Sequence, residues 1–153
     1  MLTIRQRLRR AEVLLGIDAL REAIKFGLVG TLGFLIDAGL LMLLFHVFEF
    51  SHYGARAVSF LVAVAVTWHL NRNHTFVRRK SAHARREFSI YVVAQLLGVG
   101  INLGVYTLCI TLNEAMRAFP ERALAAGSIT AMTFNFFAAR YVVFRRSASS
   151  APS

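Results

Sequence analysis

Long apolar runs divide the charged residues of this chain into separate clusters, and this pattern restricts the fold more than any other feature of the sequence. The formal net charge is +10, yet hydrophobic residues make up 56% of the 153 positions. A soluble basic protein of this size would spread its charges along amphipathic elements. A lipid bilayer instead excludes them from its centre, where one charged side chain costs about 2.5–3.5 kcal/mol. The pattern therefore predicts an integral membrane protein.

Four apolar runs are long enough to cross a bilayer as helices, which takes about 20 mostly apolar residues. They cover Phe26 to Phe48, Tyr53 to Leu70, Phe88 to Leu112 and Arg122 to Val143. Short connections join the first run to the second and the third to the fourth. The sequence thus predicts an all-α fold, an integral membrane four-helix bundle made of two tandem helical hairpins.

Lysine and arginine residues collect in cytoplasmic segments, so their positions predict the orientation of the spans. Fifteen of the 18 lie in three segments: Arg5, Arg7, Arg9, Arg10, Arg21 and Lys25 at the N-terminus, Arg72, Arg78, Arg79, Lys80, Arg85 and Arg86 in the central loop, and Arg140, Arg145 and Arg146 at the C-terminus. The remaining three, Arg56, Arg117 and Arg122, lie near the two hairpin tips. We expect an N-in, C-in topology with the tips outside.

The ends of the chain differ from the membrane domain, which we expect to cover residues 23–146. Residues 1–22 are basic and form either an amphipathic helix on the inner leaflet or a frayed cytoplasmic tail. Residues 147–153 are rich in serine and alanine and are expected to be disordered. The first apolar run is too long for the hydrophobic region of a cleavable signal peptide.

Several function classes find no support in the sequence. Cytoplasmic loops account for the basic charge, so we expect no nucleic-acid partner. The five histidines lack metal-ligand spacing, and Cys109 is the only cysteine, so neither a metal site nor an intrachain disulfide is expected. No paired carboxylates, glycine-rich phosphate loop or nucleophile–base spacing are present, so we expect neither an enzyme nor a bound cofactor.

The two predicted hairpins resemble each other in sequence. At an offset of 65 residues, Leu32, Gly33, Ile36, Asp37 and Gly39 match Leu97, Gly98, Ile101, Asn102 and Gly104. At an offset of 68, Ala63, Trp68, Arg72 and Phe76 match Ala131, Phe136, Arg140 and Phe144. Each half has two spans, so the halves run in the same direction and would be related by an axis along the membrane normal. Such a repeat suggests a pathway or a binding site between the halves.

Asp37 lies near the middle of the first apolar run, where an unpaired carboxylate is costly. One interpretation is a substrate-binding or proton-coupled carboxylate inside the bundle. The other is a hydrogen bond between helices, made with Asn102 or Gln95. The sequence leaves both open.

Glycines recur at positions 27, 30 and 33, and Gly100 and Gly104 form a GxxxG motif. Small residues let helix backbones approach closely in lipid, so we expect helix packing at both places.

Arg72 and Arg140 occupy equivalent repeat positions at the cytoplasmic ends of the second and fourth runs. A guanidinium suits bidentate phosphate binding, and lipid phosphates lie at this depth. Arginines at membrane interfaces also anchor helices without any ligand. The sequence supports both interpretations.

Three segments together resemble the GtrA-like family. Residues 25–37 are similar to the family's opening segment, residues 70–76 (Leu-Asn-Arg-Asn-His-Thr-Phe) to its ending of the second span, and residues 134–144 to its ending of the fourth. The resemblance covers about residues 23 to 146. Family members usually carry asparagine at the positions of Thr67, Asn71, Asn135 and Ala139, and this chain keeps one asparagine in each pair.

The resemblance implies a role in moving polyprenyl-phosphate-linked sugars across the bacterial inner membrane for modification of cell-envelope polysaccharide. It also implies a partner, the membrane glycosyltransferase that loads the polyprenyl phosphate with sugar. In the leading hypothesis, a flippase, Arg72 and Arg140 bind the phosphate. The polar interior residues that would contact the sugar are Asp37, Asn71, Gln95, Asn102 and Asn135.

Two other hypotheses remain from the sequence. The first alternative to a flippase is a non-transporting scaffold for the glycosyltransferase. The second, ranked lowest, is a small proton-coupled exporter. Because four short helices enclose little space, a homodimer would offer a larger path for a sugar.

Overall fold

A computed structural model describes residues 4–145, with side chains from Gly16 onward. The α-helices are α1 (Ile4–His46), α2 (His52–Leu70), α3 (Ala84–Leu112), the short α4 (Glu114–Ala118) and α5 (Pro120–Ala138). The shorter ones are the π-helical turns η1 (Asn71–Thr75) and η3 (Ala139–Val143) and the 3-10 turn η2 (Val77–Arg79). Every regular element within residues 4–145 is a helix, which confirms the expected all-α fold.

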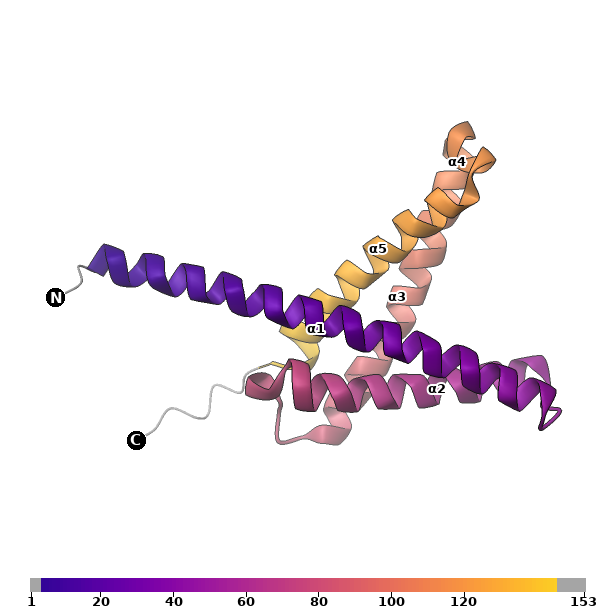
Figure 1. The fold of residues 1–153 in the computed structure, drawn as a ribbon, viewed down its shortest axis with the longest axis horizontal. Helices are drawn as coiled ribbons and strands as arrows, with labels where there is room; N and C mark the ends of the chain where they lie inside the picture. Colours follow the sequence, from indigo (N-terminus) through magenta and orange to yellow (C-terminus); the bar gives the residue numbers. More distant parts are fainter. Residues whose placement is uncertain (1–3, 146–153) are drawn as a thin grey trace.

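The helices form two hairpins that diverge from a common base. α1 packs along α2, and α3 packs along α5, with α4 at the tip of the second hairpin (Figure 1). Between the hairpins, α2 contacts α3 and α1 contacts α5 along short stretches. Figure 1 shows the hairpins crossing near the middle of α1 and their tips pointing apart. The arrangement is therefore two diverging hairpins, more open than the four-helix bundle that we expected from the sequence.

Three helical segments are long and apolar enough to cross a membrane: Gly16–His46, His52–Thr75 and Ala84–Leu112. They overlap the first three predicted spans and support a multi-pass membrane protein. α5, which contains most of the fourth predicted span, is not among them. Its first turn contains Pro120, Glu121 and Arg122, and the helix carries several hydroxyl and amide side chains, which make it a more polar segment. α5 packs along the third predicted span, α3, as a fourth span would. That α5 itself crosses the membrane stays a prediction.

Large apolar side chains are exposed along the outer faces of these helices. Leu28, Leu35, Leu103 and Leu112 are each more than half exposed. Water would penalise such a surface, whereas lipid tails solvate it without cost. The exposed faces therefore fit a protein whose sides lie in a bilayer.

The buried core lies at the base, where the hairpins meet. The rings of Phe76 and Phe144, which follow the two π-helical turns, are fully buried and stack at 4.9 Å. Each turn ends in the same bond: the Phe76 N–H donates to the Asn71 carbonyl, and the Phe144 N–H donates to the Ala139 carbonyl. Phe26 of α1 packs against Phe76. Arg72 and Phe76, like Arg140 and Phe144, are separated by three residues. The two matching segments thus form two widened turns that bring one aromatic ring from each hairpin into contact.

Basic residues of the central loop and of α1 meet at this base. Arg78 and Arg79 of the central loop form ion pairs with Asp18 and Glu22 of α1, and Lys25 donates to the His74 carbonyl. The hairpin tips lie at the opposite ends of the helices. That the base faces the cytoplasm stays a prediction from the charge distribution.

The expected domain boundary between residues 22 and 23 lies inside α1, which continues through it without a break. Residues 4–21 are therefore helical, and Asp18 already contacts the central loop. Whether this segment lies on the inner leaflet stays a prediction, and the expected disordered tail at 147–153 lies outside the described residues.

Candidate functional site

A cleft with a volume of about 510 Å³ lies between the two hairpins, and we call it the inter-hairpin cleft. Its walls come from α1, α2, η1, α3 and α5. All five predicted interior residues line it: Asp37, Asn71, Gln95, Asn102 and Asn135. The structure thus brings together polar side chains that the sequence spreads over almost 100 positions. Polar side chains that faced lipid would lack polar partners, so such a cluster indicates a sheltered interior.

Asp37 is held within the first hairpin. Its carboxylate forms an ion pair with the Arg56 guanidinium of α2 and accepts a hydrogen bond from the Ser59 hydroxyl at 2.7 Å. Ser59 is fully buried, and the Asp37 side chain is 15% exposed. The expectation of Asn102 or Gln95 as its partner was wrong, because they lie on the opposite wall and α2 reaches Asp37 first. The sequence did not single out Arg56 or Ser59 as partners.

The second hairpin carries amides where the first carries charge. The Asn102 amide donates to the Ser128 hydroxyl at 3.3 Å, and the Asn135 amide donates to the Gln95 side-chain oxygen at 3.4 Å. These bonds are long compared with the usual length of about 2.9–3.0 Å, so the amides retain hydrogen-bonding capacity for a ligand.

At the inner end of the cleft, Asn71 meets Tyr91, a residue that the sequence did not single out. The Asn71 amide donates to the Tyr91 hydroxyl at 3.1 Å, and both side chains are almost fully buried. Among residues 16–145, the side-chain oxygens of Asn71 and Asn135 are buried and accept no hydrogen bond. A buried amide oxygen without a donor costs about 1–3 kcal/mol, so both oxygens favour a ligand that brings hydroxyl or N–H donors. Tyr91 could have been found as the repeat equivalent of Phe26.

Glycine has two different uses around the cleft. A Cβ on Gly33 would collide with the Thr67 methyl, and a Cβ on Gly98 would collide with the Asn135 amide. Helix packing, as predicted, explains Gly33, and it also explains Gly98, for which no packing role was predicted. Gly27 and Gly30 line the cleft, and a Cβ on either would meet no other side chain or helix within 4 Å, so they keep space open instead.

The GxxxG motif also differs from its expected role. Gly100 and Gly104 face open space in the described part of the chain. They therefore do not mediate a contact between helices of one chain.

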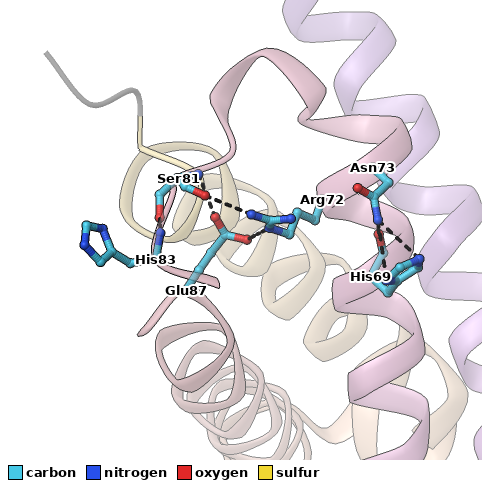
Figure 2. A network of polar contacts seen from close by, with 6 residues as sticks. All are labelled: His69, Arg72, Asn73, Ser81, His83 and Glu87. Atoms are coloured by element: carbon cyan, nitrogen blue, oxygen red, sulfur yellow. Dashed lines mark hydrogen bonds and ion pairs between the residues drawn. The ribbon is translucent and has the colours of Figure 1, made fainter. Parts of the chain in front are cut away.

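Arg72 lies outside the cleft and is bonded to its own chain. Its Nε lies 2.8 Å from a carboxylate oxygen of Glu87, and its Nη2 donates to the Ser81 carbonyl at 2.8 Å. The second Glu87 oxygen accepts from the Ser81 N–H. Figure 2 shows the guanidinium pointing toward Glu87 and Ser81, away from the neighbouring Asn73–His69 pair.

Arg140 forms the corresponding ion pair in the other half. Its Nη1 lies 2.7 Å from a carboxylate oxygen of Glu22, whose other oxygen pairs with Arg79 at 3.2 Å. The Arg140 side chain is 6% exposed. Since both predicted phosphate ligands already have carboxylate partners, the geometry favours a role in joining the hairpins.

The two ion pairs cross between the halves. Arg72 of the first hairpin binds Glu87 of α3, while Arg140 of the second binds Glu22 of α1. Glu22 and Glu87 are 65 residues apart, the offset of the repeat, and this signal could have identified them in the sequence.

Among the residues with described side chains, no group of three or more histidine, cysteine, aspartate or glutamate residues could hold a metal ion. The chemistry of the cleft is therefore that of amides, hydroxyls and one ion-paired carboxylate, which can bind a polar uncharged group.

A family model described as GtrA/DPMS, transmembrane domain, matches residues 25–144. The match includes both hairpins and all five polar residues of the cleft. No curated protein matches the sequence.

Proposed function

Because the chain belongs to the GtrA/DPMS transmembrane domain family of membrane proteins, which is linked to polyprenyl-phosphate sugars, we propose that it moves such a lipid-linked sugar across the bacterial inner membrane. The sugar would then serve the modification of cell-envelope polysaccharide. The observation that supports this proposal is the inter-hairpin cleft, where five polar side chains converge between otherwise apolar helices.

The residues of the cleft fit a sugar in a stepwise path. The free side-chain oxygens of Asn71 and Asn135 accept hydrogen bonds from sugar hydroxyls at the end of the cleft near the base. Gln95 lies beside Asn135 in the second hairpin, Asn102 lies further along α3 toward the tip of that hairpin, and Asp37 lies toward the tip of the first hairpin. A sugar moving along this path exchanges one set of hydrogen bonds for another and never enters the lipid unpaired. The prenyl chain stays in the bilayer beside the diverging hairpins.

The proposal includes a fourth crossing by α5, so that the cleft is closed on both sides by hairpins of equal depth. It assigns no catalytic step to the chain. A second copy facing the open side would shield the cleft, so a homodimer belongs to the proposal.

The decisive experiment fills the cleft without disturbing the packing. Gly30 lines the cleft and Gly100 does not, but a Cβ on either residue would stand in open space. We expect Gly30→Phe to abolish translocation, whereas Gly100→Phe retains it. The assay reconstitutes each variant in liposomes with a fluorescent polyprenyl-phosphate hexose and quenches the outer leaflet with an impermeant reductant.

Equal translocation by wild type and Gly30→Phe would contradict the proposed path. Thermal unfolding of both variants in detergent serves as the folding control, because each new ring points into open space and leaves helix contacts intact.

A scaffold function is the second candidate, and a specific observation favours it. Arg85 and Arg86 are exposed at the base, next to the satisfied Arg72–Glu87 pair, and offer positive charge to a partner. In this case the partner is the polyprenyl-phosphate glycosyltransferase. Co-purification of the enzyme with wild type but not with Arg85→Ala/Arg86→Ala, together with no translocation by the pure protein, would favour the scaffold.

A further inference from the structure

The inter-hairpin cleft has room for a sugar but contains no cation for a phosphate. Within the described residues, no lysine or arginine lines it. Arg72 and Arg140 are bonded to glutamates at the base. The arginine that does contact a residue of the cleft is Arg56, through its ion pair with Asp37. A lipid-linked sugar in the cleft would therefore meet its nearest guanidinium toward the tip of the first hairpin.

Arg56 also lines a second, almost entirely apolar pocket of about 430 Å³ at that tip, which we call the outer pocket. Its walls come from the end of α1 and the start of α2, including Leu41, Met42 and Phe45. His46 and His52 lie at the same pocket, and their rings pack on Phe45. An apolar pocket with a guanidinium at its side is complementary to a lipid chain that ends in an anion.

The Arg56 side chain is accessible to such a ligand, because it is 56% exposed in spite of its ion pair. Its position at the first turns of α2 places it near the membrane surface, where a long arginine side chain reaches the phosphate layer. The repeat equivalent of Arg56 is Leu124, so the second hairpin has no matching arginine. The site is therefore single and belongs to the first hairpin.

We propose that Arg56 binds the phosphate of a polyprenyl phosphate, with the first isoprene units of the lipid in the outer pocket. The inference rests on the proposed function. The phosphate takes the place of the Asp37 carboxylate on the Arg56 guanidinium. Asp37 then turns to the cleft and accepts hydrogen bonds from the sugar hydroxyls. One ion pair thus connects phosphate binding in the outer pocket to sugar binding in the cleft.

This partner exchange predicts opposite effects for the two residues of the ion pair. Arg56→Ala removes the phosphate ligand and lowers the affinity for polyprenyl phosphate about tenfold or more, the usual effect of losing one charge-assisted hydrogen bond. Asp37→Asn removes the competing carboxylate and raises the affinity. Arg122→Ala is the matched control, because Arg122 lies at the tip of the second hairpin over the Phe119 ring and lines neither pocket.

The experiment measures binding to the purified full chain in detergent by native mass spectrometry. The probes are polyprenyl phosphate without sugar, the corresponding polyprenol, phosphatidylglycerol and inorganic phosphate. We expect strong binding of polyprenyl phosphate alone, lost in Arg56→Ala, raised in Asp37→Asn and unchanged in Arg122→Ala. Thermal unfolding of each variant confirms that it is folded.

Unchanged binding by Arg56→Ala would overturn the proposal. So would equal losses in Arg56→Ala and Asp37→Asn, since a purely structural ion pair predicts them. Equal binding of phosphatidylglycerol or of free phosphate would overturn the assignment to a prenyl lipid. If the wild-type chain translocates the sugar but Arg56→Ala still binds polyprenyl phosphate, only this inference fails and the proposed function stands. If binding depends on Arg56 but the wild-type chain does not translocate, only the proposed function fails.

Discussion

The two hairpins share one framework but differ in the chemistry that they carry. The shared positions are Glu22 and Glu87, Phe26 and Tyr91, Gly33 and Gly98, Arg72 and Arg140, and Phe76 and Phe144. In the structure these pairs make equivalent contacts: crossed ion pairs, close glycine contacts and the stacked rings at the base. The repeat therefore preserves both the contacts that pack each hairpin and those that join the two hairpins.

The differences lie along the cleft, away from the base. Asp37 corresponds to Asn102, and Arg56 corresponds to Leu124. The first hairpin has an ion pair at this depth, and the second has a weak amide–hydroxyl contact. A substrate between the hairpins thus meets charge on one side and neutral amides on the other. The comparison teaches that packing is symmetric in this protein while the polar chemistry of the cleft is not.

The largest expected effect tests the symmetry of the base. Glu22→Ala leaves Arg140 buried without its carboxylate, and breaking a buried ion pair costs about 3–5 kcal/mol. Glu87→Ala is expected to cost less, because Arg72 is 20% exposed and water can reach it. The free energy of unfolding is measured by titration with a denaturing detergent, with the exposed Glu114→Ala at the second tip as control. A larger loss for Glu87→Ala would mean that burial of the arginine does not set the cost.

An intermediate effect tests the glycine contacts within each hairpin. A Cβ at Gly127 would lie 2.7 Å from the backbone oxygen of Asn102, which cannot move without shifting α3. Gly127→Ala should therefore cost about 1–3 kcal/mol, as overpacking usually does. Gly33→Ala meets a side chain, that of Thr67, which can rotate, so a smaller cost is expected.

The control for these glycine variants is Gly104→Ala, which faces open space. The same unfolding titration is used for all three. Equal losses for Gly127→Ala and Gly33→Ala would show that both hairpins tolerate overpacking alike, against the structure.

The smallest effect compares single hydroxyls. Ser59→Ala removes a 2.7 Å hydrogen bond to Asp37 in a buried position. Hydrogen bonds between membrane helices contribute about 0.6 kcal/mol on average, with a maximum near 1.7 kcal/mol, and we expect the upper part of this range. Ser128→Ala removes an exposed contact of 3.3 Å and should change stability hardly at all. Similar values for the two variants would remove the distinction between the charged and the neutral wall.

Local composition was enough to predict several features from the sequence. The length of each apolar run identified the first three spans, because transfer of a helix into a bilayer depends on the side chains of that helix alone. The repeat was visible as matching residues at fixed offsets. The five polar residues were also visible, because a polar side chain in an apolar membrane helix usually faces the protein interior. Their placement in one cleft agrees with that argument.

Partner choice could not be predicted from the sequence. Arg72 and Arg140 looked available for a phosphate, but each has a glutamate from the other half, and Asp37 is paired with Arg56 instead of Asn102. The charges on these residues fix only that they need partners. Which partner comes within hydrogen-bond reach depends on how the helices cross.

The sequence by itself determined that the chain is a multi-pass membrane protein of apolar helices, that these form two similar halves, and which polar residues must be sheltered from lipid. Only the tertiary structure decided that the hairpins are joined at the base and diverge above it, and which glycines pack and which keep space open. The physical reason is range: transfer into a bilayer depends on each segment's own side chains, whereas ion pairs and cavities depend on the relative positions of helices far apart in the chain.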